Sequence, residues 1–108
     1  MNMDTAEEIY SAINATKLPD IRLELVKSAI NYARIHTDWE LAFPGERREM
    51  NSDRTACHNA LISNCDILSR NMKNAGEDIE WRRNMGDDRK EIGDFACLLH
   101  CMLGIEAR

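Results

Sequence analysis

Residues 88–103 read DRKEIGDFACLLHCML, and this stretch decides the fold class. Asp88 stands three residues ahead of Glu91, which is the spacing of a capping box at the start of a helix. Apolar side chains then recur every three or four residues, at Ile92, Phe95, Ala96, Leu99 and Leu103. Because this period places the apolar side chains on one helix face, the stretch predicts an amphipathic helix.

Capping and stop signals divide the rest of the chain into further helical segments. Thr5 opens a second capping-box pattern, and Pro19 suits the first turn of a helix because its missing N–H is unpaired there anyway. Asn51-Ser52-Asp53 is a typical N-cap cluster, and Gly76 and Gly86 are typical terminators. The apolar periods between these signals predict helices over residues 5–15, 21–41, 53–74 and 78–85.

The chain contains no alternating strand pattern and no Asn-Gly hairpin, so we expect an all-α fold. Three long helices and one or two short ones, joined by brief loops, most simply form a compact antiparallel helical bundle. At 108 residues, with 44% hydrophobic and 31% charged side chains, the chain is suited to one folded domain spanning residues 1–108.

The net charge of −5 has the wrong sign for a protein that binds by neutralising phosphates, so we do not expect nucleic acid as a partner. The competing interpretation is a basic strip in which Arg47-Arg48 and Arg82-Arg83 accompany Trp39 and Trp81 for stacking on bases. No stretch of about 18 apolar residues is present, and the first residues lack the pattern of a signal peptide. The sequence therefore predicts a cytoplasmic protein without a membrane partner.

The four cysteines are predicted to be reduced thiols that act as small apolar side chains. Their spacing, eight and four residues within the two pairs, suits one helix face each. A zinc site is the competing hypothesis. Its ligands would be Cys97, His100 and Cys101, with Cys57 or His58 as the fourth, although the CxxC spacing typical of structural zinc is absent.

Polar side chains interrupt the apolar faces of the third and last predicted helices. Arg54, His58 and Asn64 lie on the former, and Asp88 and Asp94 on the latter. Because an unpaired buried amide or guanidinium costs about 1–3 kcal/mol or more, these groups are expected to form one satisfied network that braces the two helices. In the competing interpretation, Arg54, His58 and Asp94 form a pocket for an anionic ligand or for proton transfer.

The segment Glu91-Ile92-Gly93-Asp94 resembles the second acidic motif of the all-helical MazG-type nucleotide pyrophosphohydrolases. The resemblance implies that Glu91 and Asp94 help to hold magnesium, and two carboxylates three residues apart on a helix suit such a hard cation. The family also has an earlier ExxE motif, and Glu46–Glu49 and Glu77–Glu80 have that spacing. A magnesium-dependent nucleotide pyrophosphohydrolase is therefore the alternative function.

Residues 54–96 are similar to a small group of uncharacterised bacterial and phage-associated helical proteins, which implies a helical fold and a prokaryotic or phage origin. The chain has no complete catalytic set, so no catalytic residue and no cofactor is predicted. Six Met and two Trp supply material for interfaces. We expect a small non-enzymatic helical protein that acts through protein–protein contacts, as a homodimer or as a regulator or inhibitor docked on a larger partner.

Overall fold

The computed structural model describes residues 2–86 and 88–106 of the chain. No residue in these ranges lies in a strand, and the predicted all-α class is confirmed. The helices, in chain order, are α1 (Met3–Asn14), α2 (Pro19–Leu41), α3 (Pro44–Asn74), α4 (Glu80–Met85) and α5 (Arg89–Glu106).

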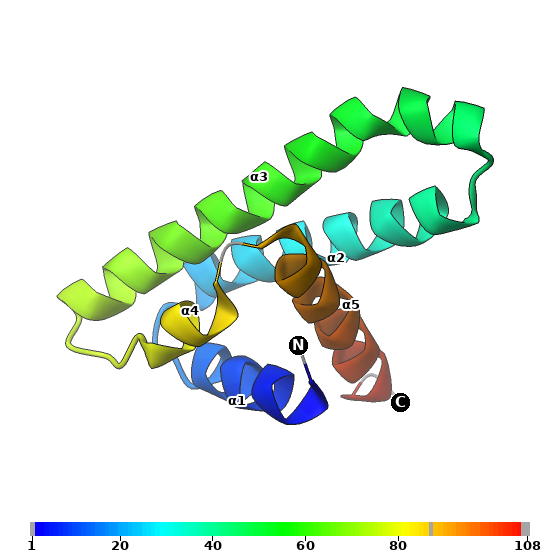
Figure 1. Cartoon of the computed structure of the whole chain (residues 1–108). Coiled ribbons are helices and arrows are strands. Elements are labelled where there is room, and N and C mark those ends of the chain that lie inside the picture. The colour runs from blue at the N-terminus through cyan, green and yellow to red at the C-terminus, as the bar shows by residue number, and fades with distance from the viewer. Residues whose placement is uncertain (1, 87, 107–108) are drawn as a thin grey trace.

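Helix α2 lies at the centre of the bundle (Figure 1). It forms an antiparallel hairpin with α3 and packs against α5 on its other side, whereas α3 and α5 contact each other far less. Helices α1 and α4 pack together beside α5. With 31 residues, α3 is about 46 Å long at 1.5 Å per residue, and it spans the molecule, whose longest dimension is 47 Å.

The core is built from the apolar stripes that the sequence predicts. Ile92, Phe95, Ala96 and Leu99 of α5 are fully buried. The side chain of Leu103, the last position of that stripe, lies outside the described residues. The other helices contribute Ile9, Ile13, Leu25, Ala29, Tyr32, Leu61, Cys65, Leu68, Met72, Trp81 and Met85 to the same cluster.

The predicted start of the third helix at Asp53 is wrong, because α3 begins nine residues earlier, at Pro44. Only Ala42 and Phe43 separate α2 from α3. Proline needs no amide partner in a first turn, and the amide of Arg47 already donates to the carbonyl of Phe43 at 2.9 Å. The predicted N-cap cluster Asn51-Ser52-Asp53 is exposed within α3, where its side chains reach solvent.

The first helix also begins earlier than predicted. Asn2 caps α1 by accepting a hydrogen bond from the amide of Thr5 at 2.8 Å, so Thr5 lies inside the helix and is not its cap. Helix α4 begins at Glu80, two residues after the predicted start. The predicted stops are confirmed, since Gly76 and Gly86 follow α3 and α4 with φ of 78° and 70°, a backbone conformation that favours glycine.

At the end of the molecule opposite the α2–α3 turn, Glu77 accepts two hydrogen bonds from the α1–α2 turn. The Thr16 hydroxyl donates to Oε2 of Glu77 at 2.9 Å, and the amide of Lys17 donates to Oε1 of the same carboxylate at 3.1 Å. Glu77 therefore joins the α1–α2 turn to the segment that follows α3.

The other end of the hairpin extends beyond the remaining helices (Figure 1). No residue is buried from Arg34 through Cys57, although buried residues recur along the rest of α2 and α3. Leu41 is 81% exposed and Phe43 is 76% exposed, more than any other large apolar side chain of the described residues. We refer to residues 38–53 as the hairpin end. None of the helices, over the residues described, has the length and apolar character needed to cross a membrane.

Candidate functional site

A pocket of about 330 Å³ opens where α5 passes the α2–α3 hairpin. It is lined by His36 and Glu40 of α2, Arg54 of α3, and Lys90 and Asp94 of α5. We refer to it as the junction pocket. Two residues of the predicted polar network, Arg54 and Asp94, are therefore brought to one pocket from different helices.

An aromatic side chain holds the arginine of this pocket. The guanidinium carbon of Arg54 lies 4.0 Å from the centre of the Trp39 ring, and that of Arg47 lies 4.5 Å from it. Arg47 also donates from Nε to the carbonyl of Trp39 at 3.0 Å and from its terminal nitrogen to the carbonyl of Glu40 at 2.8 Å. Carbonyls at a helix end lack intrahelical partners, so Arg47 caps α2 while it stacks on Trp39.

Several buried polar atoms around the junction have no hydrogen-bond partner among the described residues. They are Nε of Arg54, Nδ1 of His36, Nε1 of Trp39 and Nε2 of His58. The second ring nitrogen of His36 lies 3.0 Å from Oε1 of Glu40, so a neutral His36 carries its proton on Nε2 and leaves Nδ1 as an acceptor. An unmatched buried polar group costs about 1–3 kcal/mol. The region around the junction pocket therefore contains buried polar atoms for which the described protein atoms supply no hydrogen-bond partner.

His58 belongs to the aromatic cluster behind this region and does not line the pocket. It is 8% exposed, and its ring meets that of Tyr32 edge-on at a centroid distance of 5.6 Å. The Tyr32 ring in turn stacks on His36, with centroids 6.0 Å apart. His58 is therefore one turn along α3 from Arg54, as the sequence predicts, but its environment is packed aromatic rings.

Asn64 and Asp88 lie away from the junction pocket. The amide nitrogen of Asn64 donates to the Ser28 hydroxyl and, at 3.5 Å, to the carbonyl of Glu24, so it joins α3 to the first half of α2. Asp88 caps α5, because its carboxylate accepts from the amide of Lys90 at 2.8 Å. Among the described residues, Asn64 and Asp88 therefore bond away from the junction, and the five predicted residues do not meet at one place.

The acidic pair of the MazG-like segment, Glu91 and Asp94, is half-buried on α5. Across the described part of the chain, no three His, Cys, Asp or Glu side chains gather closely enough to hold a metal ion. Glu46–Glu49 lies in the first turns of α3, and in Glu77–Glu80 the first carboxylate is bonded to Thr16. Neither ExxE pair therefore completes a cluster with the acids of α5.

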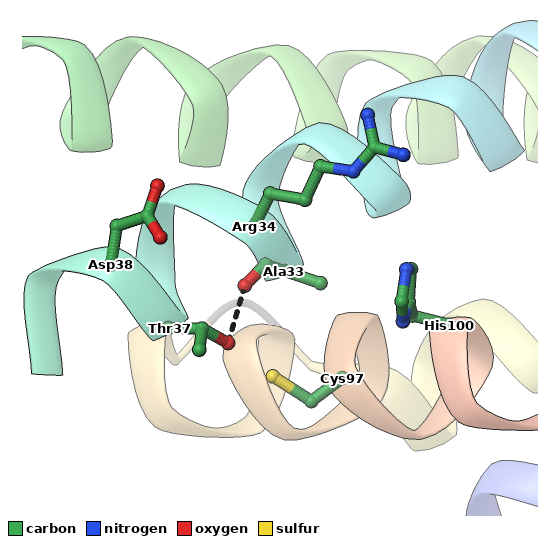
Figure 2. Close-up of a pocket in the computed structure, with 6 residues that line it drawn as sticks. All are labelled: Ala33, Arg34, Thr37, Asp38, Cys97 and His100. Atoms are coloured by element: carbon green, nitrogen blue, oxygen red, sulfur yellow. Dashed lines mark hydrogen bonds between the residues drawn. The ribbon is translucent and has the colours of Figure 1, made fainter. Parts of the chain in front are cut away.

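A second hollow, of about 430 Å³, lies between α2 and α5, and we refer to it as the α2–α5 groove. In Figure 2, Ala33 and Thr37 lie on the side of α2 towards Cys97 and His100 of α5, whereas the side chains of Arg34 and Asp38 extend away from α5. The Thr37 hydroxyl bonds back to the carbonyl of Ala33 at 2.9 Å, so it is already paired within α2 (Figure 2). The lining residues are Ala33, Arg34, Thr37, Asp38, Cys97 and His100.

The residues of the proposed zinc site lie in different parts of the structure. Cys97 and His100 line the α2–α5 groove, whereas Cys101 is exposed outside it. Cys57 and His58 lie on α3, and within the residues described these five form no metal-binding group. All four cysteines are free thiols, as predicted.

Two of these thiols are held in the protonated form. Burial raises the pKa of Cys97, and the nearby carboxylates of Glu40 and Asp94 raise it further. Burial and then the charge of Asp53 raise the pKa of Cys57. Because a thiolate is the form that attacks electrophiles and binds metals, both positions disfavour such chemistry at neutral pH.

The two arginine pairs do not form one basic strip. Arg82 donates to Oδ1 of Asp66 at 2.9 Å and to the carbonyl of Gly86 at 2.9 Å. Asp66 and Arg47 are 19 positions apart on α3, which corresponds to about 28 Å along the helix. Arg47 is itself engaged with Trp39, so neither pair is presented as the sequence hypothesis requires.

Sequence reasoning missed much of the junction pocket. Tyr32, His36 and Trp39 recur at positions i, i+4 and i+7 of α2, which places them along one helix face. This spacing is the sequence signal from which the aromatic face of α2 could have been predicted. The sequence does not predict that Glu40 and Lys90 lie near Arg54, because their proximity depends on how α5 crosses the hairpin.

No protein-family model, no curated protein and no solved structure matches this chain. The two resemblances noted from the sequence therefore stay predictions.

Proposed function

We propose that this chain is a small non-enzymatic helical protein that acts through protein–protein contacts, and that the hairpin end binds a second copy of the chain. The observation that carries the proposal is the absence of any buried residue between Arg34 and Cys57. Leu41 and Phe43, 81% and 76% exposed, lie at the turn of this uncovered segment.

The hairpin end lacks the second layer that helices normally need. Helices bury an apolar face against another element. Helix α5 approaches the last turn of α2, where Asp38 and Glu40 line pockets with it, but no residue from 38 to 53 is buried. Trp39, Ala42 and Met50 are half-buried there. Two hairpin ends packed face to face would supply the missing layer as a four-helix arrangement with two-fold symmetry, a common solution for helical proteins.

The free energy available is sufficient for reversible association. Fully burying a Leu or Phe side chain contributes about 1.5–3 kcal/mol, and a symmetric pair would bury Leu41 and Phe43 twice. The gross gain of about 6–12 kcal/mol is set against about 4–15 kcal/mol for lost translational and rotational freedom. We therefore expect a dimer that dissociates in the micromolar range or above it, and not a permanent one.

The charge of the hairpin end predicts how salt acts on this association. Residues 38–53 contain five acidic residues and two arginines, which gives each end a net charge of −3. Two like-charged ends repel, and salt screens the repulsion. Self-association should therefore strengthen with added salt, whereas binding to a partner with a basic rim would weaken.

The test is sedimentation velocity of the purified protein over about 5–500 µM at low and high salt. We expect a concentration-dependent monomer–dimer equilibrium that shifts towards dimer in high salt. The double substitution Leu41→Ser with Phe43→Ser should shift the dissociation constant upward by about tenfold or more.

The matched control is Leu23→Ser, because Leu23 is a half-exposed apolar residue of α2 outside the hairpin end. This variant should associate as the unchanged protein does. A chain that stays monomeric across the whole range contradicts the proposal, as does a double variant that dimerises normally. Association that salt weakens would point instead to a different contact surface.

A further inference from the structure

We propose that the junction pocket binds a small oxyanion that also carries a hydrogen-bond donor, such as a phosphate or an amino acid, with Arg54 and Lys90 holding the anionic group. This inference does not depend on dimerisation, because the pocket lies at the crossing of α5 with the hairpin and includes neither Leu41 nor Phe43.

Arg54 has the features of an oxyanion-binding residue. Its guanidinium is fixed 4.0 Å from the centre of the Trp39 ring, and its Nε is buried without a hydrogen-bond partner among the described residues. The guanidinium fork matches the oxygens of carboxylate or phosphate, and stacking on an aromatic ring holds it in place before a ligand arrives. Because the buried Nε has almost no accessible surface, a ligand oxygen in the pocket would meet the terminal nitrogens of the Arg54 guanidinium.

Lys90 adds a second positive charge to the same pocket from a different helix. It is exposed and lies in the first turn of α5, where the helix dipole is positive. His36 lines the pocket too, but with Nε2 donating to Glu40 its Nδ1 is an acceptor, so His36 adds no attraction for an anion. The charges of Arg54 and Lys90 are what favour a negatively charged group on this side of the pocket.

The two carboxylates of the pocket determine which anions fit. Glu40 is bonded to His36 at 3.0 Å, so part of its charge is already matched. Asp94 lines the pocket as well, and its oxygens would repel an anion that offers only acceptors. An anion bearing an O–H or an ammonium group can instead donate to a carboxylate while its oxygens face Arg54. The pocket of about 330 Å³ admits a small molecule of this kind.

The experiment is a titration of the isotope-labelled protein followed by amide and indole NMR signals at constant ionic strength. The probes are inorganic phosphate, L-alanine and acetate. Phosphate and alanine each combine oxyanion and donor, whereas acetate has no donor at neutral pH. We expect saturable shifts at Trp39, Lys90 and Asp94 with phosphate or alanine, and weaker binding of acetate. The tighter of the first two identifies the oxyanion as phosphate or carboxylate.

Two substitutions examine the assignment of roles. Arg54→Gln should weaken binding about tenfold or more, and Lys90→Gln, at an exposed residue whose loss leaves the fold intact, by about threefold to tenfold. Arg48→Gln is the matched control, because Arg48 is an exposed arginine of α3 outside the pocket. The double variant Leu41→Ser with Phe43→Ser should bind the probes normally, which separates this inference from the dimer.

Three results would overturn the inference. One is the absence of saturable binding to any of the probes. Another is equal affinity for acetate, which would remove the selection by the pocket carboxylates. The third is unchanged affinity in both Arg54→Gln and Lys90→Gln, which would place the bound ion elsewhere on the surface.

Discussion

Arg54 and Trp39, which belong to different helices, are in direct contact, with the guanidinium carbon 4.0 Å from the centre of the indole ring. This contact lies between the buried core and the uncovered hairpin end. Arg47 approaches the same ring at 4.5 Å, so one side chain of α2 holds two arginines of α3.

Replacing Trp39 with leucine should lower the free energy of unfolding by about 1–3 kcal/mol, because it removes two cation–π contacts and much of the buried ring. Urea denaturation of the purified protein measures this change. Trp39→Phe is the matched control, since it keeps one aromatic ring for the two arginines while it removes the rest of the indole, including the buried Nε1 that has no partner in the described residues. The stacking account predicts a smaller loss for phenylalanine than for leucine, and equal losses would contradict it.

Gly93→Ala should stabilise the protein by up to about 1 kcal/mol, the difference in helix propensity between the two residues. A Cβ at this position would lie 3.6 Å from Cε1 of Tyr32 and 3.9 Å from Cε1 of His36, which are ordinary contact distances. The neighbours are side chains, so the added methyl group would pack against the rings of Tyr32 and His36 and would not displace backbone. Thermal unfolding provides the measurement, and a lowered melting temperature would refute the prediction.

Glu77→Ala should destabilise the protein by about 1–3 kcal/mol, because the Thr16 hydroxyl and the Lys17 amide both lose their acceptor. Chemical denaturation again reports the difference. Glu7→Ala, at an exposed acid of α1, is the control and should stay within about 0.5 kcal/mol of the unchanged protein. If both substitutions had the same effect, the contact would contribute nothing specific.

Stability should fall as the pH rises from about 8 to 9.5, the range in which thiols of the unfolded chain ionise. Burial and nearby carboxylates raise the pKa of Cys97 and Cys57 in the folded protein. The folded state therefore keeps protons that the unfolded state releases, and a rising pH favours unfolding. The double variant Cys57→Ser with Cys97→Ser should show a flatter pH profile, measured by denaturation at several pH values.

The thiols also give a direct chemical readout. Alkylation by iodoacetamide at neutral pH should reach exposed Cys101 before Cys97, because Cys97 is half-buried and its pKa is raised. Mass spectrometry of the digested protein locates the label. Faster labelling of Cys97 would contradict the environment described for the α2–α5 groove.

Local sequence patterns predicted the helices well but not all of their ends. Features that depend only on residues close in sequence were predictable. They include the apolar stripe Ile92–Leu99 and the helix stops at Gly76 and Gly86. The cluster Asn51-Ser52-Asp53 misled the prediction of α3, because residues that cap helices are also accepted on an exposed helix face. Pro44 begins α3, because a first helical turn accepts proline, although a proline also commonly follows the end of a helix.

The candidate site was predicted in part. Arg54 and Asp94 do line one pocket, but Asn64 bonds to α2 and Asp88 bonds to the first turn of α5. Which polar side chains meet is set by the crossing of α5 over α2, and helical periodicity carries no information about crossing. The same limit explains why Lys90 was not recognised as a member of the pocket.

The uncovered hairpin end has a consequence for the motions of the folded chain. Short helical segments with no buried residue are less stable than those in the core, so we expect residues 38–53 to open more readily than the rest of the molecule. Their amide protons should exchange with deuterium by local opening, ahead of those around Leu61 and Phe95, which require global unfolding. A ligand or a second chain seated on this segment would be recorded as slower exchange there and nowhere else.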